Sequence, residues 1–187
     1  MASHNKDTDK LQQATFAGGC FWCTEALLAQ LAGVVAVMPG YAGGTLAQPD
    51  YQTVCTGETG HAECVQVTFD PAVIDYPTLL QAFMLSHDPT TKDRQGHDVG
   101  SQYRSAIFTH DPVQARQAQD VIAAFGRSGV FGAPIVTEIV PLVQFWPAEA
   151  EHHDFFARSP QQRYCAFVIA PKVAAFREQF AELLRDA

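Results

Sequence analysis

The stretch QATFAGGCFWCTEALLAQLAGVVAVMPGY, residues 13–41, places a strand, a turn, a helix and a second strand in direct succession. Residues 13–19 predict a short strand that ends in two glycines. Leucines at helical spacing follow, and Gly33 ends the predicted helix before a strand over 34–41. Cys20 is therefore predicted at the turn from a strand into a helix.

The rest of the chain continues this alternation. Residues 62–70 alternate in polarity, which predicts a strand with Val65, Val67 and Phe69 on one face. The remaining periodicity predicts helices over 75–85, 111–125, 147–159 and 171–184, and strands over 105–110 and 134–143. The order β-α-β-β-α-β-α-β-α-α contains the ferredoxin-like βαββαβ unit. We expect an α+β two-layer sandwich with this core, extra C-terminal helices and long loops.

Composition limits the class of protein. A chain of 187 residues with 47% hydrophobic content suits one domain, expected over 13–187 after a flexible tail over 1–12. A net charge of −8 without a basic run argues against nucleic acid as a partner. The polar first ten residues predict a flexible tail rather than a signal peptide, and no apolar run approaches about 18 residues, so we expect no membrane partner.

The number and spacing of the cysteines indicate whether the protein's compartment is reducing or oxidising. Five cysteines, an odd number without a framework pattern, suit a reducing environment, so a cytoplasmic location is expected.

Cys20 is the first candidate for chemistry. The partial positive charge at a helix N-terminus favours a thiolate, so the pKa of Cys20 is expected to be depressed. The alternative is a buried thiol that acts as a small apolar residue. With Cys23 three residues on, a nucleophile with a partner thiol is the better interpretation. A disulfide between the two is expected to be strained or transient. Phe21 and Trp22, between them, are core residues or the wall of an apolar slot.

The stretch HAE, residues 61–63, reproduces the H-x-E motif of zinc-dependent deaminases. In those enzymes the C-x-x-C follows H-x-E and has proline before it, whereas here it comes first and follows glycine. A structural zinc site would combine Cys20 and Cys23 with His61 and Cys64. The odd separation of the last two places them on opposite faces of a strand. We therefore expect no metal.

Glu63 shares the parity of the apolar face of its predicted strand. A carboxyl held in partly dry surroundings has a raised pKa and can donate a proton near neutral pH. The alternative, a glutamate at the strand end that bends back to solvent, stays open from the sequence. Tyr51 and Tyr103 lie on the two long irregular connections, where binding groups concentrate.

Taken together, these stretches resemble the peptide methionine sulfoxide reductase A family over nearly the whole chain. The motifs occur in the order TFAGGCFWCTEALLAQLAGV, GYAGG, PDYQTVCTGETGHAECVQVTFDP, HDPTTKDRQGHDVGSQYRSAIF, IVTEIVPL, FWPAEAEHHDFF and RYCAFVIAPK. The resemblance implies reduction of methionine S-sulfoxide, free or in proteins, without a metal or organic cofactor. It also implies thioredoxin as the reductant, and we expect a monomer.

The resemblance also implies roles for individual residues. Matched by motif, they are the nucleophile Cys20, the proton donor Glu63, the hydroxyls Tyr51 and Tyr103 that hold the sulfoxide oxygen, the acidic Asp98, the methyl pocket Phe21 and Trp22, and His152 near that pocket.

The motifs offer two candidates for the resolving thiol. Cys165 matches the family's resolving cysteine near the C-terminus, whereas Cys23 stands where many members have glycine. Both are candidates, and Cys165 is favoured because a residue on a tail can move to Cys20 without distorting the first helical turn. Two alternatives stay open: a general C-x-x-C thiol-disulfide oxidoreductase and a zinc-stabilised binding module.

Overall fold

The computed structural model describes residues 10–186, so most of the predicted N-terminal tail lies outside the described residues. The elements are β1 (Gln12–Gly18), α1 (Phe21–Leu28), β2 (Val34–Ala42), α2 (Tyr51–Cys55), β3 (Ala62–Phe69), α3 (Tyr76–Leu85), β4 (Arg94–Gln95), β5 (Asp98–Val99), η1 (Ser101–Tyr103), β6 (Ser105–Thr109), α4 (Pro112–Ser128), β7 (Glu138–Pro141), β8 (Phe145–Pro147), η2 (Ala150–His152), α5 (Phe155–Arg158), η3 (Cys165–Ile169), α6 (Ala170–Gln179) and η4 (Ala181–Leu183).

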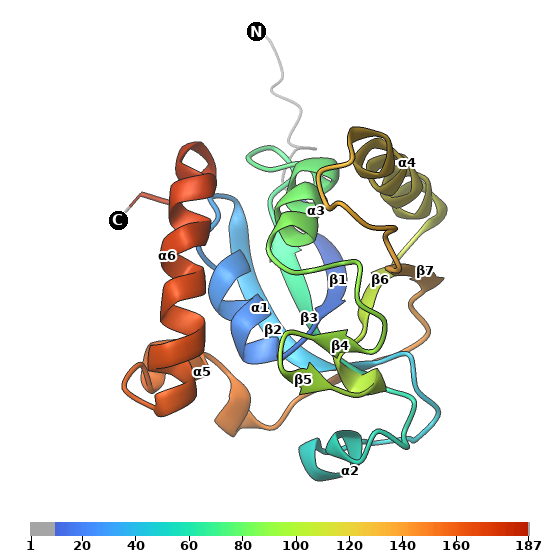
Figure 1. The fold of residues 1–187 in the computed structure, drawn as a ribbon, viewed down its shortest axis with the longest axis vertical. Coiled ribbons are helices and arrows are strands. Elements are labelled where there is room, and N and C mark those ends of the chain that lie inside the picture. The colour runs from blue at the N-terminus through green and yellow to red at the C-terminus, as the bar shows by residue number, and fades with distance from the viewer. Residues whose placement is uncertain (1–9, 187) are drawn as a thin grey trace, which may run out of the picture.

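A six-stranded sheet organises the fold, in the order β7-β6-β1-β3-β2-β8. Neighbouring strands are antiparallel except β6 and β7, which are parallel. Helix α1 packs across β1, β2 and β3, and α6 lies beside α1 (Figure 1). The predicted mixed α+β class is confirmed.

The two faces of β3 enter different clusters, as its alternation predicts. Val65, Val67 and Phe69 are fully buried in the large cluster under α1 and α3. Cys64 faces the other way, into a smaller cluster with Phe108 that the chain around β7 and β8 covers. Burial on both faces makes the sheet register specific, because a slip by one residue would exchange the two sets.

Local signals explain where the main helices begin. Asp75 and Asp111 each accept a backbone N–H three residues on, and each is followed by a proline in the first helical turn. Asp50 caps the short helix α2 through a reciprocal capping box with Thr53. At the far end of α4, Gly129 takes a left-handed conformation with φ 69°.

Three sequence predictions are corrected toward the C-terminus. The predicted helix over 147–159 is interrupted: η2 and α5 are separate short helices, and Asp154 between them has φ 51°. The predicted strand over 134–143 shortens to β7, and β8 was not predicted. The last helix, expected over 171–184, ends earlier: α6 stops at Gln179 and the short helix η4 follows it. The π-helical turn η3 precedes α6 and was not expected.

In the part of the chain that is described, no helix has the length and apolar character needed to cross a membrane.

Gly40 of β2 is required by close packing. A Cβ there would lie 2.4 Å from the backbone oxygen of Trp146 and 2.4 Å from Cζ of Phe145. We expect Gly40→Ala to separate β2 from β8 and to lower the free energy of unfolding by about 1–3 kcal/mol. In Gly126→Ala, the matched control in α4, the new Cβ meets nothing within 4 Å. This control should raise stability by about 0.5–1 kcal/mol. Urea denaturation measures both, and equal shifts would contradict the packing argument.

Candidate active site

Cys20 lies at the N-cap of α1, where β1 turns into the helix. Gly19 makes this turn with φ 92°, and a Cβ there would lie 2.6 Å from Cγ of Gln95. A side chain is therefore excluded both by backbone conformation and by space. Cys20 thus lies at the predicted turn from strand into helix, and the structure shows it half-buried there.

The two thiols of the C-x-x-C are close enough that a hydrogen bond between them has the largest influence on the pKa of each. The bond to Cys23 raises the pKa of Cys20 well above its ordinary value, and burial and the nearby Glu63 act in the same direction. The same bond lowers the pKa of Cys23 to about 7, assisted by the positive charge of Lys172. The prediction of a depressed pKa at Cys20 is therefore wrong, because its donated hydrogen bond and its burial outweigh the helix N-terminus.

Cys23 is also linked to an acidic residue through Tyr164. The Cys23 Sγ lies 3.7 Å from the Tyr164 hydroxyl, which donates to Oδ2 of Asp98 at 3.2 Å. The Tyr164 hydroxyl has one proton, so at any moment it can donate a hydrogen bond either to the Cys23 sulfur or to the Asp98 carboxylate, but not to both. Asp98 reaches the site through this tyrosine.

Glu63 lies beside Cys20 and is 1% exposed, which excludes the solvent-facing alternative. Its Oε2 accepts the backbone N–H of Phe21, the first residue of α1, at 3.1 Å. Burial raises the pKa of Glu63 to about 8, with further contributions from the charges of Asp98 and Cys23, and the Phe21 N–H partly opposes the rise. The carboxyl therefore holds a proton at neutral pH.

Tyr51 and Tyr103 approach the same carboxyl from α2 and η1. Burial raises the pKa of both hydroxyls, and Glu63 is among the charges that raise each further. Asp98 and Cys20 also raise the pKa of Tyr103, so the predicted nucleophile and acidic residues lie within electrostatic range of this hydroxyl. Both hydroxyls therefore remain protonated and can donate hydrogen bonds.

The aromatic residues after Cys20 take different places. Phe21 is fully buried and belongs to the core, with its ring 6.3 Å from that of Tyr51. Trp22 is half-buried, stacks on Phe155 at 3.8 Å between ring centroids and lies 6.4 Å from Tyr51. The rings of Trp22 and Tyr51 thus lie side by side, and Phe21 is buried beneath them. We call Trp22 and Tyr51 the aromatic walls.

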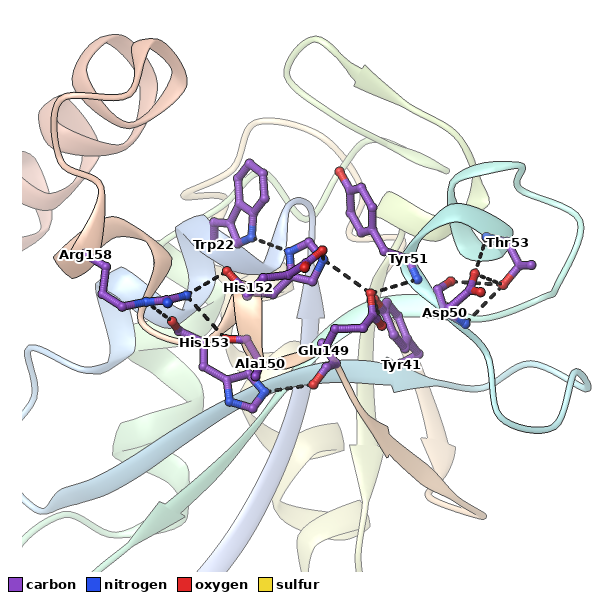
Figure 2. A network of polar contacts seen from close by, with 12 residues as sticks. Trp22, Tyr41, Asp50, Tyr51, Thr53, Glu149, Ala150, His152, His153 and Arg158 are labelled. Carbon is purple, nitrogen blue, oxygen red and sulfur yellow. Dashed lines mark hydrogen bonds and ion pairs between the residues drawn. The ribbon is translucent and has the colours of Figure 1, made fainter.

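His152 belongs to the same aromatic group. Its ring lies 4.5 Å from that of Tyr51, and its Nδ1 accepts the indole N–H of Trp22 at 3.1 Å (Figure 2). With 5% of its surface exposed, it lies behind the aromatic walls rather than on the open surface.

Cys165 is fully buried in η3, where it packs in one cluster with Cys23, and Cys20 contacts that cluster from its edge. It does not lie on a free tail. The reason for which the sequence favoured it over Cys23 therefore does not apply to this structure.

The metal interpretation of residues 61–64 finds no support in the geometry of His61. Its Nδ1 accepts the backbone N–H of Gly44, and its Nε2 lies 2.7 Å from the carbonyl oxygen of Leu46. Both ring nitrogens are occupied by backbone groups, so the ring holds a loop rather than a metal ion.

Sequence reasoning missed three residues that contact the site: Tyr164, Phe155 and Glu149. Tyr164 precedes Cys165, and its place beside the thiols gave no separate signal in the sequence. The other two fall in the region predicted as one continuous helix, whose interruption is what brings them to Trp22 and Tyr51.

A reactive thiol pair, a protonated buried carboxyl and neutral tyrosine hydroxyls on an α+β scaffold define a thiol-dependent oxidoreductase. The family model described as peptide methionine sulfoxide reductase matches residues 12–184. The chain belongs to this family.

Individual relatives agree with this assignment. The chain is 55% identical to peptide methionine sulfoxide reductase MsrA of Ralstonia nicotianae over 179 residues, which covers 94% of each chain. Among solved structures, reduced Mxr1 from Saccharomyces cerevisiae is similar with a TM-score of 0.79 at 33% identity, covering 86% of this chain and 92% of that one. Mxr1 in complex with Trx2 matches with a TM-score of 0.56 at 26% identity, covering 82% and 90%.

The raised pKa of Glu63 predicts how stability changes with pH. From pH 4.5 to about 8, folded Glu63 keeps a proton that the unfolded chain releases. Stability should therefore fall as pH rises through this window, by roughly 1.4 kcal/mol per pH unit, and level off above it. Glu63→Gln should remove this contribution. Glu25, whose burial raises its pKa to about 7, adds a similar slope below pH 7 in both proteins.

Urea denaturation at intervals between pH 5 and 9 measures the difference. Glu58→Gln, at an exposed turn, is the control and should follow the wild type. A Glu63→Gln curve parallel to wild type would show that Glu63 is ionised in the folded protein.

Proposed function

We propose that this protein reduces the S-epimer of methionine sulfoxide, free or in proteins, with Cys20 as nucleophile and Glu63 as proton donor. The observation that supports this most strongly is the position of Glu63: it is buried and bound to the first N–H of the helix that begins after Cys20. A sulfoxide oxygen leaves only when it gains a proton, so a nucleophilic thiolate must face a neutral acid.

Substrate binding follows from the aromatic walls. The S-methyl group would lie against Trp22 above the buried Phe21, in an apolar setting. The sulfoxide oxygen would face Glu63 and the hydroxyls of Tyr51 and Tyr103. Neutral donors suit this oxygen because its negative charge grows during attack.

The first step begins within the thiol pair. At neutral pH the Cys23 thiolate takes the Cys20 proton along their hydrogen bond and so activates the nucleophile. The Cys20 sulfur attacks the sulfoxide sulfur, and Glu63 protonates the oxygen. The oxygen is then transferred as a hydroxyl to the Cys20 sulfur, and both the substrate sulfur–oxygen bond and the transient bond between the two sulfurs break. Methionine leaves and Cys20 becomes a sulfenic acid, with the substrate reduced and Cys20 oxidised.

Resolution by Cys23 needs the least movement. Cys23 is close enough to Cys20 to be the main influence on its pKa, so its thiol can displace the hydroxyl of the sulfenic acid and form a disulfide with loss of water. Cys165, buried in a helical turn, is the alternative resolver or a later acceptor of the disulfide by exchange with Cys23.

Thioredoxin would regenerate the dithiol by exchange, an expectation supported by the solved complex of the similar Mxr1 with Trx2. Five free cysteines suit a reducing cytoplasm. We further propose a monomer with one catalytic domain over 13–187. The antiparallel order β6-β1-β3-β2 supports a ferredoxin-like βαββαβ core, with α1 and α3 as its crossover helices.

Replacing the acid tests the proposed chemistry. We expect Glu63→Gln to slow methionine release in a single turnover by about a hundredfold or more, the range of general acid catalysis. Alkylation of Cys20 by iodoacetamide at about pH 7 should be as fast as in wild type, because a neutral amide replaces a neutral carboxyl and Cys23, the main influence on the pKa of Cys20, is unchanged.

Glu58→Gln should behave as wild type in both assays. The lowered pKa of Cys23 also suits a general C-x-x-C thiol-disulfide oxidoreductase. That function predicts no effect of Glu63→Gln on turnover, so full activity of the variant would favour it.

Counting thiols identifies the resolver. The reduced protein is mixed with excess methionine S-sulfoxide without a reductant, and free thiols are titrated. Wild type and Cys165→Ser should each lose about two thiols per chain, whereas Cys23→Ser should lose one and hold a sulfenic acid that dimedone traps. If Cys165→Ser accumulates the sulfenic acid and Cys23→Ser forms a disulfide, Cys165 is the resolver.

A further inference from the structure

The cluster of Glu149, Glu151 and His152 lies outside the proposed chemistry. One ligand atom from each lies within 4.8 Å of the others, the arrangement of a possible metal site. Nε2 of His152 is buried and makes no hydrogen bond to any residue within 10–186, and carboxylate oxygens near it are Oε2 of Glu149 at 3.4 Å and Oε1 of Glu151 at 3.8 Å.

The indole of Trp22 argues against a metal. Its N–H is a donor only, so Nδ1 of His152 must offer its lone pair to it. The proton of the neutral ring is then on Nε2, directed at the carboxylates (Figure 2). A nitrogen that carries a proton has no lone pair for a metal ion, so this geometry instead supports electrostatic attraction between Nε2–H and Glu149.

The carboxylate of Glu149 accepts hydrogen bonds from groups on different elements. Its Oε1 accepts the hydroxyl of Tyr41 from β2 at 3.1 Å, and its Oε2 accepts the backbone N–H of Tyr51 from α2 at 3.2 Å. The proton on Nε2 of His152, from η2, faces the same Oε2 and extends the connection to Trp22 on α1. All of these groups are donors, which suits an ionised carboxylate as their shared acceptor.

We propose that Glu149 is a positioning residue that fixes the positions of Trp22 and Tyr51, the two aromatic walls of the proposed substrate pocket, relative to each other. It fixes the start of α2, and with it Tyr51, directly, and it fixes Trp22 through the tautomer and orientation of His152. This proposal rests on the proposed function, because the pocket is argued to bind the methyl side of the sulfoxide. His152 is accordingly a support behind the pocket rather than a residue that contacts substrate.

Glu149→Ala removes the shared acceptor and should raise the half-saturating concentration of methionine S-sulfoxide in single turnovers about tenfold, the effect of roughly one lost hydrogen bond. Glu149→Gln keeps a carbonyl acceptor and should recover most of the loss. Glu151→Ala, 3.8 Å from the same ring nitrogen but with its side chain 79% exposed, is the matched control and should match wild type. The rate of Cys20 alkylation should stay unchanged in all three.

A second readout does not depend on activity. In ¹⁵N-labelled protein, the indole N–H of Trp22, assigned by its loss in Trp22→Phe, should exchange with water faster in Glu149→Ala and at the wild-type rate in Glu151→Ala. The imidazole ¹⁵N shifts of wild type should show a proton on Nε2 of His152 and none on Nδ1.

The outcomes separate the two proposals. A wild type that releases no methionine refutes the proposed function, while the indole exchange still tests the role of Glu149. If Glu149→Ala matches Glu151→Ala in both readouts, or loses activity only in proportion to its unfolded fraction, the positioning role is overturned. Stoichiometric zinc binding in calorimetry, lost in Glu149→Ala, would also overturn it and establish a metal site.

Discussion

The hydrogen bond from the backbone N–H of Phe21 to the buried carboxyl of Glu63 joins the first turn of α1 to strand β3. It depends on the glycine turn before Cys20 and on the register of β3, which directs Glu63 to the side of the helix. Without this N–H, the ionised carboxylate would be still more costly to bury. The contact therefore gives the carboxyl a fixed place beside the nucleophile, around which the other groups of the site gather.

The site keeps its charges low at rest. The interaction with Cys23, followed by burial, raises the pKa of Cys20, and burial raises the pKa of Glu63, so each holds its proton, while Cys23 has a pKa of about 7 and carries the available negative charge. Cys20 becomes a thiolate when its proton is transferred to the Cys23 thiolate. Such an arrangement allows a nucleophile and an acid to coexist in one small buried space, where two permanent negative charges would repel each other.

From the sequence, the local structure around Cys20 and Glu63 could be predicted better than the pKa of Cys20 or the arrangement of the C-terminal elements. Alternation in β3 and the turn before α1 are local signals: they predicted the place of Cys20 and the parity of Glu63 with the apolar face, but they left the burial of Glu63 open. The pKa of Cys20 depends on a hydrogen bond from a side chain and on desolvation, which helix position alone does not reveal. Similarly, local propensity favours continuous helix over 147–159 and does not reveal the break at Asp154. The burial of Cys165 depends on tertiary packing in one cluster with Cys23, which local sequence does not reveal either.

The central claim is that Glu63 is a neutral acid at physiological pH. It is tested most directly by a ¹³C NMR titration of the glutamate side-chain carboxyls in the reduced protein, with the Glu63 resonance assigned by its absence in Glu63→Gln. The account predicts a titration midpoint near 8 for this carboxyl. A midpoint close to 4.5, the ordinary value for glutamate, would mean that the carboxyl is ionised at neutral pH and cannot be the proton donor.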